Sequence, residues 1–355
     1  NILLRCETKK FEKRTPLIPD HARLLTNNGT KIYVERSDER IHTDEEYANA
    51  GCELIPRNSW IHADKNHYIL GIKELPNLNK PLSGQHIYFA HAFKHQAGSE
   101  TLLAQFKQGN GTILDYEFLI DSFNHSVVTS SFSYWAGFCG AAISLLAWDA
   151  RLRNSNATIP LFYSDKAILI AELKDRISNW PSLPKSLIIG ANGFSGRGAR
   201  ALLDKLHITH HHWARHHTHN EGPFPEILEY DILFNCINLT KKIKPFITRD
   251  LLKNNKNLGI ITDVSCDVSS PHNPLPIYDS VTTFNNPLFH VDCESTIPVD
   301  VIAIDHLASF LPRESSESFS AQLLPYLLEL LACGPNQEKS VWKNAIKKYH
   351  EAMTQ

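Results

Sequence analysis

The chain has 355 residues, of which 42% are hydrophobic and 21% charged, so it can bury a sizeable core and is expected to form two domains. Its 36 basic and 38 acidic residues give a formal charge of -2, which provides no general attraction for phosphate backbones or anionic lipid. The longest apolar run, Trp135 to Trp148, is too short to cross a bilayer and predicts a buried helix. We therefore expect neither nucleic acid nor a membrane as a partner.

The first residues and the cysteines favour a cytoplasmic location. Residues 1–14 lack the order of basic, apolar and small-residue segments that marks a secretory signal. The seven cysteines are odd in number and never spaced as Cys-x-x-Cys, so they indicate neither a zinc ribbon nor a disulfide framework. A reducing compartment fits this cysteine usage best.

The first part of the chain alternates short apolar runs with helical patterns, which is typical of an α/β fold with parallel sheets. Strands are predicted at residues 2–6, 31–35, 52–56, 66–73, 86–93 and 112–118. Helical patterns lie between them at residues 17–29, 44–51 and 99–111. This order predicts a first Rossmann-like sheet.

A second series of the same kind follows two Leu- and Ala-rich helices at residues 134–153 and 166–180. Its strands are predicted within residues 185–190, 231–237, 258–266 and 301–307, and helices at 315–334 and 340–353 come last. We therefore expect two Rossmann-like domains with parallel sheets, separated by an interdomain cleft. The predicted domains are a substrate-binding and catalytic domain of residues 1–134 and 321–355, and a dinucleotide-binding domain of residues 135–320.

A glycine-rich turn joins an apolar strand to a Leu-rich helix in the second series. Gly190, Gly193 and Gly196 form the pattern Gly-x-x-Gly-x-x-Gly. Glycines at such a turn let backbone N–H groups approach a pyrophosphate, and the N-terminus of the following helix favours its negative charge. The flanking strand and helix favour a dinucleotide site over a merely tight turn.

A histidine-rich stretch follows this helix, with seven of the chain's 19 histidines between His207 and His219. It coincides with the second strand of the Rossmann unit, on which adjacent histidines point to opposite faces. It also lacks the two spaced ligand pairs of a structural zinc site. We expect no metal here and interpret the stretch as a strand and loop that tolerate imidazoles.

The end of the same strand bears on the choice of cofactor, because an acid there usually binds the adenosine ribose. Here Trp213 is followed by Ala214 and Arg215, with no carboxylate before Glu221. Either Arg215 meets a 2′-phosphate, which makes NADP the cofactor, or another group holds the ribose of NAD. We predict NAD and keep NADP as the alternative.

Lys73 and His91 each follow an apolar strand of the first series. Open α/β sheets bind ligands outside the carboxyl ends of their strands, so both side chains are placed to face a ligand. Lysine and histidine suit acid–base chemistry on an amine, because burial lowers a lysine pKa towards neutrality and histidine titrates there. Spacing alone favours a solvated charge or a structural role for each, and a solvated basic face for the group between Lys9 and Arg14.

Several strings along nearly the whole chain resemble one enzyme family. They include ETKKFEKRTPLIP at 7–19, FAHAFKHQAG at 89–98, PHNPLPIY at 271–278 and IDHLASFLPRE at 304–314. On these strings the chain resembles the lysine-forming saccharopine dehydrogenases, relatives of alanine dehydrogenase and of the transhydrogenase α subunit. The resemblance implies oxidative cleavage of saccharopine, a small molecule, by NAD to give L-lysine, 2-oxoglutarate and NADH.

The resemblance also implies roles for single residues. Lys73 would take the proton from the secondary amine, His91 would handle the water that hydrolyses the imine, and Arg14 would hold a substrate carboxylate. The implied residues around the substrate are Lys9, Glu12, Arg14, Glu74, Lys94, Glu117 and Phe132. The glycine turn and the resemblance together predict cofactor contacts at Gly190, Gly193, Phe194, Gly196, Arg215, Thr218, Asn238, Val264, Ile304 and Asp305.

The sequence departs from the family pattern at three places. Ala214 stands where the family has an Asp, and Phe194 where it has an Arg in the glycine loop. Residues 123–132 lack the Arg expected to bind a substrate carboxylate, for which His125 is a candidate substitute. Two alternatives therefore stay open: a related NAD(P)-dependent dehydrogenase of another amino acid or secondary amine, and a dinucleotide-binding protein without turnover. The oligomeric state is not fixed by the sequence, which is compatible with a monomer.

Overall fold

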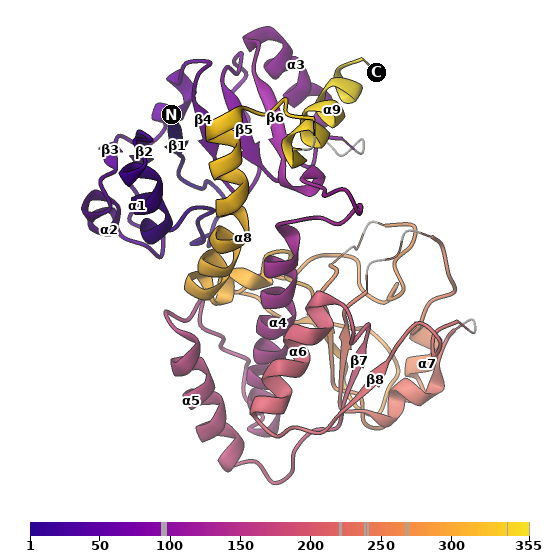
Figure 1. Cartoon of the computed structure of the whole chain (residues 1–355). Coiled ribbons are helices and arrows are strands. Elements are labelled where there is room, and N and C mark those ends of the chain that lie inside the picture. The colour runs from indigo at the N-terminus through magenta and orange to yellow at the C-terminus, as the bar shows by residue number, and fades with distance from the viewer. Residues whose placement is uncertain are drawn as a thin grey trace. The chain divides into compact units, whose positions relative to one another are not determined.

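The computed structural model describes residues 1–93, 98–219, 222–237, 239, 241–266, 268, 270–338 and 340–354. The chain forms two compact units, the first from Asn1–Ser131 with Pro312–Gln355 and the second from Phe132–Leu311 (Figure 1). The sequence placed the return to the first domain at residue 321. Helix α8 (Pro312–Cys333) is one continuous helix that belongs to the first unit from its start, so the return comes earlier than expected.

The first unit contains a six-stranded sheet in the order β3-β2-β1-β4-β5-β6. Its strands, all parallel, are β1 (Ile2–Leu4), β2 (Ile32–Glu35), β3 (Glu53–Ile55), β4 (Tyr68–Leu70), β5 (Gln85–Tyr88) and β6 (Thr112–Asp115). The helices are α1 (Pro19–Asn27), α2 (Asp44–Asn49), α3 (Ser99–Gly109), α8 and α9 (Val341–Met353), with short 3-10 turns at Ser59–His62 and Tyr116–Phe118. This strand order is the one found in dinucleotide-binding Rossmann folds.

The two C-terminal helices pack against this sheet and its loops. Serine hydroxyls of α8 accept hydrogen bonds from the backbone N–H groups of Thr15 at 3.0 Å and Ile18 at 3.1 Å. Tyr349 of α9 is buried and donates its hydroxyl to the carbonyl oxygen of Gly111 at 2.8 Å. The last residues of the chain therefore complete the core of the first unit.

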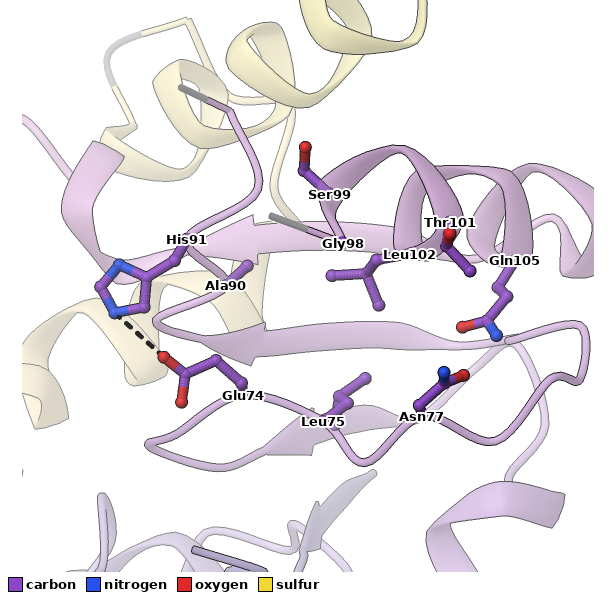
Figure 2. A pocket seen from close by; sticks show the side chains of 10 residues that line it. All are labelled: Glu74, Leu75, Asn77, Ala90, His91, Gly98, Ser99, Thr101, Leu102 and Gln105. Atoms are coloured by element: carbon purple, nitrogen blue, oxygen red, sulfur yellow. Dashed lines mark ion pairs between the residues drawn. The ribbon is translucent and has the colours of Figure 1, made fainter. Parts of the chain in front are cut away.

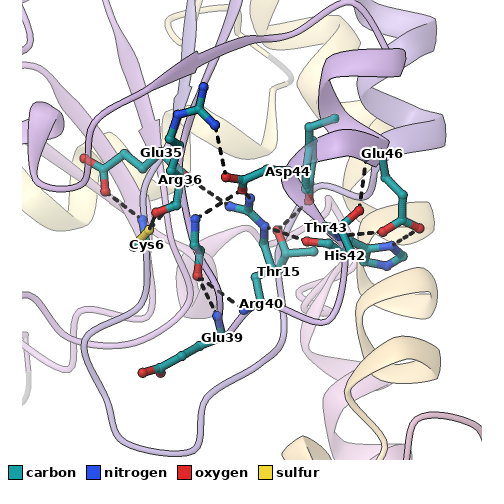
Figure 3. Close-up of polar contacts among 12 residues, drawn as sticks. Cys6, Thr15, Glu35, Arg36, Glu39, Arg40, His42, Thr43, Asp44 and Glu46 are labelled. Atoms are coloured by element: carbon teal, nitrogen blue, oxygen red, sulfur yellow. Dashed lines mark hydrogen bonds and ion pairs between the residues drawn. The ribbon is translucent and has the colours of Figure 1, made fainter.

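A polar network orders the loops after β1 and β2 (Figure 3). The buried carboxylate of Glu35 accepts hydrogen bonds from the backbone N–H groups of Cys6 and Trp60, each at 2.9 Å. Arg40 pairs with Asp44 at 2.9 Å and donates to the carbonyl oxygen of Glu35 at 3.2 Å. Burial and the nearby Glu35 charge raise the pKa of Cys6 to about 11, so its thiol stays protonated at neutral pH.

The second unit contains another six-stranded sheet, in the order β11-β12-β10-β9-β7-β8. Its strands are β7 (Ser186–Ile189), β8 (His210–Trp213), β9 (Ile232–Asn235), β10 (Ile260–Asp263), β11 (Phe289–His290) and β12 (Asp300–Ile302). All pairs are parallel except β11 with β12. The helices are α4 (Thr129–Leu152), α5 (Lys166–Ser178), α6 (Phe194–Lys205) and α7 (Arg249–Leu252), with 3-10 turns at Pro225–Glu229 and Leu307–Phe310.

Helices α4 and α6 touch through glycines. A Cβ atom at Gly137 of α4 would collide with the backbone of Ser195, and one at Gly198 of α6 with the backbone of Tyr134. Such close packing against α4 fixes the position of α6 and of the glycine turn before it. The apolar run from Trp135 to Trp148 lies wholly within α4 and is mostly buried, as expected.

The prediction of an α/β fold with two Rossmann-like parallel sheets is confirmed. Within the part of the chain that the structure describes, no helix combines the length and apolar character needed to cross a bilayer.

Candidate active site

Four neighbouring strands of the first unit bring charged side chains to one edge of its sheet. The segment after β1 carries Lys9, Glu12 and Arg14, while Lys73 and Glu74 follow β4, His91 follows β5 and Glu117 follows β6. Strands β1, β4, β5 and β6 are adjacent and parallel, so their carboxyl ends meet at the same edge. Ligands of open α/β sheets bind at this edge.

His91 lies between two carboxylates. Its Nε2 atom is 3.6 Å from Glu74 Oε1, and its Nδ1 atom is 3.8 Å from Glu117 Oε1. The side chain of His91 is 38% exposed, so the ring is accessible to a small molecule. His91 has a φ of +49°, a left-handed conformation that is uncommon for a residue with a side chain. A proton on either ring nitrogen therefore faces a carboxylate, which suits a group that accepts and releases protons.

A pocket of about 470 Å³ lies beside His91 (Figure 2). It is lined by Glu74, Leu75, Asn77, Ala90, His91, Gly98, Ser99, Thr101, Leu102 and Gln105. His91 and Glu74 lie at one end, and the amides of Asn77 and Gln105 lie at the other. The volume falls within the range of small-molecule sites.

Lys73 is held through its backbone by two residues that the sequence reasoning did not single out, Arg5 and Glu7. Glu7 accepts hydrogen bonds from the N–H groups of Ile72 at 2.6 Å and Lys73 at 3.0 Å. Arg5 donates from Nη2 to the carbonyl oxygen of Lys73. The only sequence signal for this arrangement was the position of both charges directly after an apolar strand.

Arg14 and Glu12 form a buried bidentate ion pair. Arg14 Nε lies 2.8 Å from Glu12 Oε1, and Arg14 Nη2 lies 2.6 Å from Glu12 Oε2. The residues are 5% and 3% exposed. The guanidinium therefore lies at the predicted edge, with its orientation fixed by Glu12.

Three other residues with predicted or candidate roles at the substrate are not seen among these charged side chains. Phe132 is in the first turns of α4 and belongs to the second unit. Lys94 lies outside the described residues. His125, the candidate substitute for the missing Arg, has a side chain that is 77% exposed and lies 3.8 Å from Asp121.

The glycine turn of the second unit fits a pyrophosphate group. Gly190 has a φ of +85°, and a Cβ on it would lie 2.9 Å from the carbonyl oxygen of Cys236. A Cβ on Gly196 would collide with the backbone of Gly190 and Ala191. Gly193 caps α6 without a side-chain hydrogen bond, so the first N–H groups of this 12-residue helix remain available to an anion. The turn also lies where β7 borders both β8 and β9, the switch point of the sheet.

The other predicted cofactor residues follow neighbouring strands of the same sheet. Arg215 is exposed after β8, and Thr218 donates its hydroxyl to the carbonyl oxygen of Arg215 at 3.4 Å. Val264 follows β10, and its N–H donates to the carbonyl oxygen of Asn235 at 2.9 Å. Phe194, which opens α6, is 49% exposed. The predicted contact at Asn238 lies outside the described residues.

Two further predicted cofactor residues follow β12. Ile304 is buried. Asp305 is paired with His306 at 2.5 Å between Oδ1 and Nδ1. Both therefore lie at the carboxyl edge of the sheet, two strands from β9.

The histidine-rich stretch forms the edge strand β8 and the loop after it. His210 Nδ1 lies 2.7 Å from His212 Nε2, and His210 Nε2 lies 2.8 Å from Asp204 Oδ1. His211 points elsewhere and lies 3.1 Å from the hydroxyl of Tyr230. Within the described ranges, no group of three or more His, Cys, Asp or Glu side chains could hold a metal ion.

Known proteins match the chain at the level of sequence. Residues 3–139 match the family described as alanine dehydrogenase/PNT, N-terminal domain. The saccharopine dehydrogenase (NAD(+), L-lysine-forming) of Neurospora crassa is 42% identical over 358 residues, covering 98% of this chain and 95% of the relative. The protein of the same name from Schizosaccharomyces pombe is 41% identical over 368 residues, covering 100% of this chain and 98% of the relative.

Solved structures match it at the level of the fold. An L-alanine dehydrogenase aligns with a TM-score of 0.69 at 15% identity, covering 98% of this chain and 94% of that one. A transhydrogenase from Sinorhizobium meliloti aligns with a TM-score of 0.67 at 15% identity, covering 97% of each chain. At this identity the likeness establishes the fold alone.

Proposed function

Because this chain belongs to the saccharopine dehydrogenase (NAD(+), L-lysine-forming) family, we propose that it catalyses the reversible oxidative cleavage of saccharopine to L-lysine and 2-oxoglutarate. The reaction consumes NAD and water and releases NADH and a proton. The observation that carries the proposal is the position of His91 between Glu74 and Glu117, at the same sheet edge as Lys73.

In this proposal the first unit supplies the proton transfers. NAD, held by the glycine turn of the second unit, would supply the hydride acceptor for the carbon that joins the glutarate part of saccharopine to the secondary amine. Lys73 takes the proton from that amine, and His91 moves protons to and from the water that adds to the resulting imine. Each transfer of this kind contributes roughly 10²–10⁴-fold to the rate. Glu74 and Glu117, 3.6 and 3.8 Å from the His91 ring nitrogens, balance the positive charge while the ring is protonated.

Arg14 contributes the cation for a substrate carboxylate. Its bidentate bond to Glu12 sets the plane of the guanidinium before the substrate arrives. A guanidinium held in this way suits a carboxylate better than a mobile lysine does, because its N–H groups form a fixed fork. Lys9, at the same edge, adds a second positive charge.

The second unit holds the cofactor. We assign the pyrophosphate to the turn of Gly190, Gly193 and Gly196 and to the N-terminus of α6. Side chains added at Gly190 and Gly196 would meet backbone, which supports this assignment. We assign the nicotinamide to the carboxyl ends of β10 and β12, near Val264 and Asp305. NAD is the cofactor in the names of the relatives, and NADP remains the alternative that Arg215 would serve.

Cellular location and assembly are further parts of the proposal. All seven cysteines are thiols and none forms a disulfide bond, which supports action in the cytoplasm. We propose that the chain acts on its small substrates as a monomer. Light scattering of the purified protein measures its mass directly, and a dimer would overturn this point.

Turnover is tested by mixing the purified protein with lysine, 2-oxoglutarate and NADH. We expect NADH absorbance to fall only when both lysine and 2-oxoglutarate are present. Ornithine in place of lysine, and pyruvate in place of 2-oxoglutarate, serve as matched controls. Tight NADH binding with no turnover would instead indicate a dinucleotide-binding protein, and turnover with a different amine would indicate a related dehydrogenase.

A further inference from the structure

The backbone of residues 71–73 is fixed by charged side chains from the segment after β1. Glu7 accepts the N–H groups of Ile72 and Lys73, at 2.6 and 3.0 Å. Arg5 donates to the carbonyl oxygen of Lys73 and pairs through Nη1 with Glu7 Oε2 at 3.3 Å. Both hydrogen-bonding groups of the Lys73 backbone are therefore held by side chains of the segment after β1.

This ion pair lies where ions are expensive to keep. The side chains of Arg5 and Glu7 are only 1% and 7% exposed. Burial raises the pKa of Glu7, while the Arg5 charge and the two backbone N–H groups oppose that rise. A buried ion pair is often no more stabilising than apolar residues of the same volume. Stability alone is therefore a weak reason for this pair, and its contacts with residues 72 and 73 suggest another.

Gly71 and Tyr88 leave the Arg5 guanidinium one position. A Cβ atom at residue 71 would overlap Nε, Cζ and Nη2 of Arg5. The guanidinium carbon also lies 5.6 Å from the centroid of the Tyr88 ring. Arg5 is thus packed against Gly71, which follows β4, and against Tyr88 of β5.

The contacts lie at the switch point of the first sheet. Strands β1 and β4 are neighbours, with Leu4 paired to Leu70. From this pair, β2 and β3 extend the sheet in one direction, and β5 and β6 extend it in the other. Ligands bind in the crevice at such a point. Hydrogen bonds that fix the residues after β4 therefore affect the geometry of the candidate site.

We propose that Arg5 and Glu7 are positioning residues that hold the Lys73 backbone so that its ammonium group reaches the substrate nitrogen. The proposal rests on the proposed function, in which Lys73 transfers the proton. Neither residue touches the substrate, and both act through the 71–73 segment.

The first test is Glu7→Gln, which keeps the size of the side chain but leaves one acceptor oxygen for two N–H donors. We expect kcat in the lysine-forming and saccharopine-forming directions to fall about tenfold or more, since misplacing a proton-transfer group removes much of its contribution. The dissociation constant of NADH should stay within about twofold, because the cofactor is assigned to the other unit. Rates are expressed per NADH-binding site, so unfolded protein does not lower them.

A matched control separates positioning from stability. Asp149 is also a buried carboxylate, 1% exposed, and it accepts hydrogen bonds from Arg153, Arg176 and Trp180 in the second unit. Asp149→Asn should lower the melting temperature while leaving kcat per binding site unchanged.

The pH profile of kcat gives a readout that a purely structural role would not move. The limb that belongs to Lys73 is identified as the one that Lys73→Met abolishes. In Glu7→Gln this limb should move to lower pH by about half a unit or more, because a negative charge beside Lys73 is lost while Arg5 remains. The other charges around the segment, Glu12, Glu74 and His91, are the same in both proteins.

Gly71→Ala tests the same device without removing a charge. Its methyl group should displace Arg5 from the Lys73 carbonyl and lower kcat with NADH affinity retained. Wild-type kcat in both Glu7→Gln and Gly71→Ala would overturn the positioning role while leaving the proposed function intact. No turnover by the wild-type protein would instead remove the proposed function, and the positioning role with it.

Discussion

The carboxyl edges of the two sheets offer different chemistry to a ligand. In the first unit the edge carries ionisable side chains, with His91 between Glu74 and Glu117 and the buried pair of Arg5 and Glu7 bonded to the Lys73 backbone. In the second unit the edge between β7 and β9 carries glycines and the uncapped start of α6. In the proposed function, two sheets of similar topology thus provide side-chain chemistry in one case and backbone recognition in the other.

Because of this difference, the two edges should be sensitive to different kinds of substitution. The charged side chains at the edge of the first unit act through hydrogen-bonded and ion-pair partners. Replacing one of them by an uncharged side chain of the same shape should therefore disturb this edge most. The glycine turn of the second unit depends on empty space, so one added methyl group should disturb it most.

Neutral replacement of the two proposed acid–base residues should have the largest effect. Lys73→Met and His91→Gln should each lower kcat about 10²-fold or more, since each removes one proton transfer, and NADH affinity should change less than about twofold. Steady-state kinetics and NADH fluorescence titration measure the two quantities. The matched controls are Lys65→Met and His62→Gln, which remove the same groups from exposed positions of the first unit. Full activity in Lys73→Met or His91→Gln would remove that residue from the mechanism.

A single methyl group should be nearly as disruptive in the second unit, but for binding rather than chemistry. A Cβ on Gly196 would lie 2.6 Å from the Cα atom of Ala191, so the glycine turn must shift. We expect Gly196→Ala to raise the NADH dissociation constant about tenfold or more, equivalent to ~1.4 kcal/mol. Gly193→Ala is the comparison, because its Cβ would lie 3.4 Å from the carbonyl oxygen of Gly190 and its φ of -72° suits alanine. Equal affinity in both variants would count against a pyrophosphate at this turn.

The contrast between the edges also explains what the sequence could predict. Strand ends and the glycine turn are local patterns, so Lys73, His91 and Gly190 could be placed at carboxyl edges from the printed residues alone. The contacts of Arg5 and Glu7 could not be predicted, because their partners lie 65 to 68 positions away along the chain. Such pairings depend on which strands become neighbours in the sheet, and no alternation of apolar residues encodes that.

The histidine-rich stretch shows that composition alone can mislead, because residues that cluster in the sequence need not cluster in space. Seven histidines lie close together in sequence, yet His211 faces Tyr230 while His210 and His212 face each other. Alternation along strand β8 separates them to two faces. His91 lies between two carboxylates, and these come from the separate segments that follow β4 and β6. Side-chain density along the chain is therefore a poorer guide to a site than the order of strands in the sheet.

A buried charge outside both edges should affect stability and not chemistry. Burial alone would raise the pKa of Asp149, but hydrogen bonds from Trp180 and Arg176 and the charge of Arg153 outweigh it and lower the pKa. A carboxylate with a lowered pKa stabilises the fold above its unfolded-state pKa, and this contribution is lost as pH falls through the folded-state pKa. Asp149→Asn should therefore cost about 1–3 kcal/mol at neutral pH.

The pH dependence of this stability difference separates it from other effects of the substitution. The melting-temperature difference between wild type and Asp149→Asn should start to shrink as the pH falls below about 4, where the unfolded-state carboxylate becomes protonated, and should vanish only below the lowered folded-state pKa. A difference that stays constant from neutral to acid pH would mean that the Asp149 charge is not what stabilises α4 and α5.

The smallest effect is expected at Arg215, where the backbone chemistry of the second unit gives way to a side chain. Arg215 is exposed after β8, and the residue before it is Ala214 where an acid usually binds the ribose. If the cofactor is NAD, Arg215→Ala should change the NADH dissociation constant less than about threefold, as exposed substitutions usually do. If the guanidinium instead meets a 2′-phosphate, the charge-assisted bond is worth ~1.5–3 kcal/mol, and NADPH affinity alone should fall more than about tenfold. Titration of the wild-type protein and of Arg215→Ala with NADH and with NADPH distinguishes the two cases. A selective loss of NADPH affinity would replace the assignment of NAD with NADP.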